Sequence, residues 1–147
     1  GYLYGLRLDY DVTAGWTYTF LIFGGGNTNV STPEHPVGSE HPERGGWIAI
    51  PHDFSAYTKL VFKIRSRSAT ENPKTMKIEL ADSGGTKAYV IATITANWQT
   101  YELPLSSFPL LKKESIKQIT FVLEGWRIKQ AAGSEVGTVF IDSVQFE

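Results

Sequence analysis

Apolar and polar residues alternate along most of this chain with a period of two. The clearest case is the segment 60–65, where Leu60, Phe62 and Ile64 share one face. Because successive side chains of a strand point to opposite faces, this pattern predicts a half-buried β-strand. Alternation, or a run of aromatic and β-branched residues, predicts further strands at 6–12, 16–23, 47–50, 77–80, 89–94, 99–103, 119–123 and 138–146.

Glycine and proline mark the turns between these segments. Residues 27–46 hold several prolines and glycines and predict a long surface loop, and residues 83–85 predict a hairpin-like turn. No stretch carries the apolar stripe of a helix, and residues 110–116 are expected to form at most one helical turn. About eight or nine short strands at this spacing predict an all-β antiparallel sandwich or barrel, with residues 1–147 as a single domain.

The composition adds one positive indication and several exclusions. Aromatic residues make up 13% of the chain, and such a surplus often means that some rings face outward as stacking platforms. The formal net charge of −1, without long runs of one sign, gives no reason to expect nucleic acid or an anionic membrane as partner. The absence of cysteine excludes disulfides, thiolate catalysis and cysteine-ligated zinc.

The segment 97–108 reads Asn-Trp-Gln-Thr-Tyr-Glu-Leu-Pro-Leu-Ser-Ser-Phe. It resembles a segment of the carbohydrate-binding modules of the galactose-binding-like jelly-roll group, most closely those of families 11 and 30. Segments 53–66, 116–121 and 137–144 are similar, in the same order, to other strands of these modules. The resemblance implies a jelly-roll β-sandwich that binds polysaccharide chains of the β-glucan type, cellulose among them, without cleaving them. It also implies a secreted module tethered to a catalytic domain such as a glycoside hydrolase.

Two structural expectations follow from this resemblance. Trp98 belongs to the shared segment, so it is expected to be a core residue. The family's modules usually carry one or two strands upstream of the strand that corresponds to residues 6–12, whereas this chain starts almost on that strand. We therefore expect an incomplete sheet edge, covered by residues 1–5 or by the loop 27–46, because exposed strand edges tend to be blunted or covered.

A sugar site needs aromatic rings that stack on a pyranose face, together with polar groups that bind its hydroxyls. Gly15 and Trp16 match the glycine-aromatic step that opens a groove-lining strand in family 11, so the resemblance makes Trp16 the first candidate ring. Tyr18 lies on the same face of the strand. The alternative is that both rings belong to the core.

A second group of candidates follows the strand at 119–123, where family 11 places a ligand-contacting tyrosine. That position is Leu123 in strict register, so Glu124, Trp126 and Arg127 are the candidates to replace it. The alternative role for Trp126 is a loop residue that covers the end of the barrel. Trp47, which follows a glycine-rich stretch, is a further candidate for a groove ring.

Catalysis finds little support in these residues. Glycosidases of similar shape carry a Glu-x-Asp-x-Glu strand whose carboxylates flank the bond to be cut, and this chain has no such strand. Arg7, Asp9 and Asp11 share a strand face, where a solvated surface is expected. Besides a sugar-binding module, the sequence allows a structural or protein-interaction sandwich and, as the weakest hypothesis, a small glycanase or lyase. No cofactor is predicted; Asp142 is the candidate ligand for the structural calcium that is common in the group.

Overall fold

Strands dominate the computed structural model, which describes residues 5–22 and 51–147. The elements in chain order are β1 (Leu6–Asp11), β2 (Trp16–Ile22), β3 (Lys59–Ser66), β4 (Thr75–Asp82), β5 (Lys87–Thr93), β6 (Gln99–Pro104), the 3-10 helices η2 (Leu105–Ser107) and η3 (Lys113–Ser115), β7 (Ile116–Glu124), α1 (Gly125–Gln130) and β8 (Val136–Phe146). The predicted all-β class is confirmed, and each predicted strand in the described ranges is present. The predicted strand at 47–50 lies outside those ranges.

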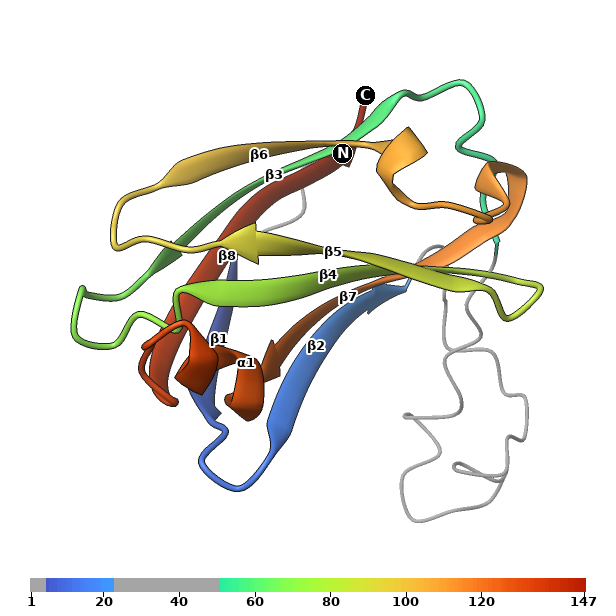
Figure 1. The fold of residues 1–147 in the computed structure, drawn as a ribbon. Coiled ribbons are helices and arrows are strands. Elements are labelled where there is room, and N and C mark those ends of the chain that lie inside the picture. Colours follow the sequence, from blue (N-terminus) through green and yellow to red (C-terminus); the bar gives the residue numbers. More distant parts are fainter. Residues whose placement is uncertain (1–4, 23–50) are drawn as a thin grey trace, which may run out of the picture.

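The strands form two four-stranded sheets that pack face to face (Figure 1). Sheet A has the order β1-β8-β3-β6, and sheet B has the order β2-β7-β4-β5. All these pairings are antiparallel, and most join strands that are far apart in the sequence, such as β1 with β8. The antiparallel sandwich predicted from the sequence is therefore confirmed.

The core lies between the sheets and is built from the alternating apolar residues. Phe62 of sheet A and Phe121 of sheet B are fully buried, and their rings meet edge to face with centroids 5.6 Å apart. Burying one such ring contributes roughly 1.5–3 kcal/mol to folding. Because the inward set takes every second residue, the set between them faces outward and is free to form a binding surface.

The prediction that Trp98 is a core residue is wrong, because its side chain is 49% exposed. Tyr101 faces the core from β6, and Trp98 lies three positions earlier, so the two-residue period turns it to the outer face of sheet A. The guanidinium of Arg65 lies over its ring, 5.2 Å from the centroid, and 4.8 Å from the ring centroid of Phe140.

The structure also contains a helix that the sequence pattern did not predict. Gly125–Gln130 forms α1 directly after β7, so Trp126 sits in a helix and not in a loop. Six residues are too few to show an apolar stripe, and Ile128 is the single large side chain that α1 buries. Gly125 is required here: a Cβ atom would lie 2.3 Å from the carbonyl oxygen of Val12 and 2.7 Å from that of Gly15. The turn expected within 110–116 is η3.

The first two strands of the chain, β1 and β2, each lie at the edge of a sheet. Among the described strands, β1 pairs with β8 alone and β2 with β7 alone. The segments expected to cover an edge are residues 1–5 and 27–46; except for Gly5 they lie outside the described part of the chain, so their role stays a prediction.

Candidate functional site

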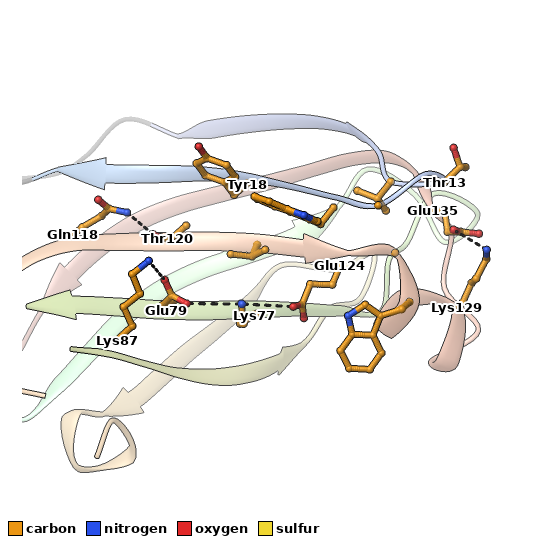
Figure 2. Close-up of a pocket in the computed structure, with 16 residues that line it drawn as sticks. Thr13, Tyr18, Lys77, Glu79, Lys87, Gln118, Thr120, Glu124, Lys129 and Glu135 are labelled. Carbon is orange, nitrogen blue, oxygen red and sulfur yellow. Dashed lines mark hydrogen bonds and ion pairs between the residues drawn. The ribbon is translucent and has the colours of Figure 1, made fainter. Parts of the chain in front are cut away.

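A groove of about 720 Å³ lies on the solvent face of sheet B (Figure 2). This volume falls within the range of about 300–1,000 Å³ that is typical of ligand sites. Its lining residues come from strands β2, β7, β4 and β5, the turn before β2, helix α1 and the residue before β8: Val12, Thr13, Gly15, Trp16, Tyr18, Lys77, Glu79, Lys87, Gln118, Thr120, Val122, Glu124, Gly125, Trp126, Lys129 and Glu135.

The register of sheet B explains why these side chains meet. Trp16 pairs with Glu124 across β2 and β7, and Lys77 of β4 lies opposite Val122. Residues paired in this way share a face of the sheet. The residues that alternate with them along each strand, such as Leu123, point into the core. The groove is therefore lined by the outward-facing and mostly polar residues of these strands.

Two aromatic rings form one rim of the groove. Trp16 is 65% exposed and Tyr18 is 47% exposed, and their rings lie nearly parallel with centroids 5.4 Å apart. A third ring, that of Trp126 in α1, is 59% exposed and also lines the groove. Exposed rings gathered on one concave surface are typical of a binding site, since large apolar groups are otherwise buried.

The floor of the groove carries a chain of alternating charges. The Lys77 ammonium lies 3.5 Å from a carboxylate oxygen of Glu124 and 3.8 Å from one of Glu79. Lys87 adds a second cation 3.9 Å from Glu79, as Figure 2 shows. At the other end of the chain, the Nε–H of Arg127 donates to Glu124 over 2.8 Å. Both carboxylates are 16% exposed, so they are held in place. Fixed donors and acceptors of this kind can bind sugar hydroxyls from below.

Arg127 contacts two groove residues, Trp126 and Glu124, without lining the groove itself. Its guanidinium lies 4.4 Å from the centroid of the Trp126 ring while it pairs with Glu124. It is not among the residues that line the groove. The geometry therefore makes Arg127 a positioning residue for one ring and one carboxylate of the groove.

Of the candidates predicted from the sequence, four line the same groove: Trp16, Tyr18, Glu124 and Trp126. Trp47 lies outside the described residues. The floor residues were not predicted from the sequence: Lys77, Glu79, Lys87, Gln118 and Thr120. The available signal was their alternation with buried residues, but only the pairing of β4 with β7 shows that they face the same groove.

The outer face of sheet A carries the other charged residues considered above. Arg7 and Asp9 are exposed and form an ion pair 3.1 Å long, as expected for a solvated surface. The Thr138 hydroxyl, which donates to Asp9, and the Arg7 guanidinium hold the pKa of that carboxyl below its usual value. Asp142 accepts a hydrogen bond from the backbone N–H of Ser143. Residues 5–22 and 51–147 contain no cluster of three or more acidic, histidine or cysteine residues suited to a metal ion, and no helix among them is long and apolar enough to cross a membrane.

Comparisons with known proteins place this fold. No protein-family model matches the chain, and no similar protein was found among curated sequences. A family 11 carbohydrate-binding module of a cellulosomal cellulase of Clostridium thermocellum is 17% identical, with 99% of this chain and 88% of that chain covered and a TM-score of 0.51. A family 11 module from the same organism, solved in complex with a β-1,3-1,4-mixed-linked tetrasaccharide, is 16% identical, with coverages of 99% and 89% and a TM-score of 0.51.

An exo-β-agarase gives a TM-score of 0.64 at 14% identity, where 97% of this chain matches 20% of the agarase. The chain therefore spans about one fifth of that enzyme. At these identities the comparisons show the fold: the chain has the β-sandwich of the family 11 modules, as the sequence resemblance implied.

Proposed function

We propose that this chain is a non-catalytic carbohydrate-binding module that holds a neutral polysaccharide of the β-glucan type in the groove on sheet B. One observation carries the proposal: the exposed rings of Trp16 and Tyr18 stand beside a floor of fixed, paired charges. Rings bury the C–H faces of a sugar, and fixed polar groups bind its hydroxyls and set specificity.

The charge pattern of the groove supports binding over catalysis. A glycosidase needs a protonated carboxylic acid and an ionised carboxylate that act on one bond. Glu79 and Glu124 are both paired with cations, and Lys77 lies between them. Two carboxylates held in this way favour the role of fixed hydrogen-bond acceptors.

The neighbouring structures suggest which polysaccharides to test. One family 11 module binds a mixed-linked tetrasaccharide, so mixed-linked β-1,3-1,4-glucan is the first probe. Agarose, a neutral galactan and so an alternative to the β-glucan type, is the second probe, because the matched part of an exo-β-agarase gives a higher TM-score than the family 11 modules do. In either case the module acts outside the cell and brings an attached enzyme to its substrate.

Affinity electrophoresis tests this proposal. Gels that contain mixed-linked β-glucan, a soluble cellulose derivative, xyloglucan, mannan or agarose are run with the wild-type protein and the Trp16→Ala variant. The wild type is expected to be retarded in the mixed-linked glucan gel or the agarose gel, and the variant much less. The Trp98→Ala variant, which removes an exposed tryptophan from sheet A, is the matched control and should migrate like the wild type.

Two results would contradict the proposal. Migration that no neutral polysaccharide changes would favour a structural or protein-interaction sandwich. New reducing ends released by purified protein, and lost in a Glu124→Gln variant, would show that the groove is catalytic.

A further inference from the structure

The groove runs along the strands of sheet B. Gln118 and Lys87 lie at one end, Lys129 and Glu135 lie at the other, and Glu79, Lys77 and Glu124 lie between them (Figure 2). From Gln118 to Glu124, β7 advances about 20 Å, at about 3.4 Å per residue. A polymer in the groove therefore has one end of its path near the start of β7 and the other near α1.

Three segments meet at the α1 end and are joined to one another. The backbone N–H of Gly125 donates to the carbonyl of Gly15 over 2.8 Å, which ties α1 to the turn before β2. The N–H of Val12 donates to the carbonyl of Glu135 over 2.9 Å, which ties the same turn to the start of β8. The Lys129 ammonium lies 3.5 Å from a carboxylate oxygen of Glu135 and links α1 to β8. These contacts make the three segments one unit.

This unit lies at the α1 end of the groove, beyond the ends of the strands that form the floor. β2 begins at Trp16 and β7 ends at Glu124, so the turn, α1 and Glu135 all lie beyond the end of the sheet, yet all of them line the groove. Figure 1 shows α1 at the end of β7 and beside the start of β2. Ile128 is fully buried and anchors the helix, while Trp126 and Lys129 are exposed on it. At the opposite end, the described lining residues lie on the strands themselves.

We propose that the groove receives the end of a glycan chain, with the terminal sugar against the wall formed by Trp126, Lys129 and Glu135. This inference rests on the proposed function and specifies which part of the polysaccharide the site takes. An internal sugar carries a further sugar where this wall stands, so a chain cannot continue past α1 along the groove. A terminal sugar instead carries a free hydroxyl at that point, which the Lys129–Glu135 pair and the Thr13 hydroxyl are placed to bind.

Binding capacity distinguishes chain ends from chain interiors. A short and a long fraction of mixed-linked β-1,3-1,4-glucan are titrated by calorimetry at equal mass, and agarose fractions are treated in parallel. If the protein binds chain ends, the long fraction binds fewer moles of protein per gram of polysaccharide than the short one, in inverse proportion to chain length. The affinity per bound end is the same for both fractions. Equal capacity per gram for both fractions would overturn the chain-end proposal and leave the proposed function intact. Absence of binding to both fractions of both polysaccharides would contradict the proposed function itself.

A double variant tests whether the named wall is responsible. Trp126→Ala with Lys129→Ala removes two exposed side chains while Ile128 keeps α1 in place. The long fraction should then bind more protein per gram than it does in the wild type, because the chain can pass the end of the groove. The matched control is Trp98→Ala with Lys63→Ala, a tryptophan and a lysine exposed on sheet A, which should leave capacity unchanged. A correctly folded double variant that keeps the wild-type capacity would contradict the assignment of the wall.

Discussion

Replacing Trp16 with alanine is expected to remove binding while largely preserving the fold. Trp16 is 65% exposed, so only about one third of its side chain is buried by the protein. Since truncating a fully buried tryptophan costs about 3–5 kcal/mol, the unfolding free energy should fall by about 1 kcal/mol. Trp98 is 49% exposed, and the same scaling gives about 2 kcal/mol for Trp98→Ala.

The effect on binding should show the opposite order. A ring that anchors a ligand typically contributes about 2 kcal/mol or more, so Trp16→Ala should weaken glycan affinity by about thirty-fold. Trp98 lies on the other sheet, and its replacement should leave affinity unchanged. Urea denaturation gives the stability of both variants, and calorimetric titration with the mixed-linked tetrasaccharide or an agarose oligosaccharide gives their affinity. A Trp16→Ala variant that binds as tightly as the wild type, or that loses more stability than Trp98→Ala, would contradict the role given to Trp16.

Three further variants probe the groove and the packing of the sandwich that carries it. Gly125→Ala should destabilise the protein by about 3 kcal/mol, because the new Cβ would press against two backbone carbonyl oxygens; an unchanged urea midpoint would contradict this packing. Lys77→Met removes the ammonium that two glutamates share on the groove floor, and should lower both glycan affinity and stability. The loss of stability should be about 2 kcal/mol, which lies between the values for exposed and for buried ion pairs. An unchanged affinity and an unchanged urea midpoint would show that this charge chain is not needed. The pKa of Asp82 is held below its usual value mainly by the backbone N–H of Lys112, so its contribution to stability is present at neutral pH and is lost as the pH falls below about 4. In Asp82→Asn this loss should be absent, so the stability difference from the wild type should shrink between about pH 5 and pH 2; a constant difference would refute the assignment.

The strands could be predicted because period-two alternation is a local property. Leu60, Phe62 and Ile64 point into the core as their spacing indicated. The helix α1 could not be predicted in this way, since it is short and is held by one buried isoleucine and by the close approach of Gly125 to two backbone carbonyls. Those contacts join residues that are more than a hundred positions apart, and the pattern of a single segment does not contain them.

The error at Trp98 has a simple geometric cause. Its place in the shared segment suggested the core, whereas Trp98 directly precedes β6 and its three-residue distance from Tyr101 already predicted the opposite face. At this position the two-residue alternation of side chains predicted the exposure better than the family resemblance did. The resemblance was the better guide at Trp16, whose place at the opening of a groove-lining strand matches its exposure beside the groove.

The residues on the groove floor could not be recognised without knowing the order of the strands. Trp16, Tyr18, Glu124 and Trp126 could be named from the sequence because the family resemblance pointed to the start of one strand and the end of another. Lys77 resembled any solvent-facing lysine, and only the pairing of β4 with β7 brings Glu124 to it, opposite its strand neighbour Glu79. Sheet order in a sandwich is set by long-range pairing, so a floor built from three strands becomes visible only in the folded protein.

The indole N–H signals of the tryptophans give the most direct test of the central claim that the groove on sheet B binds glycan. Two-dimensional 15N NMR spectra are recorded while the mixed-linked tetrasaccharide or an agarose oligosaccharide is added, with the signals assigned from single tryptophan variants. With the bound oligosaccharide, the signals of Trp16 and Trp126 should shift together and saturate at one dissociation constant, and the signal of Trp98 should stay in place. A shift confined to Trp98, or no shift of Trp16 and Trp126 at concentrations where binding is measured by calorimetry, would contradict the account.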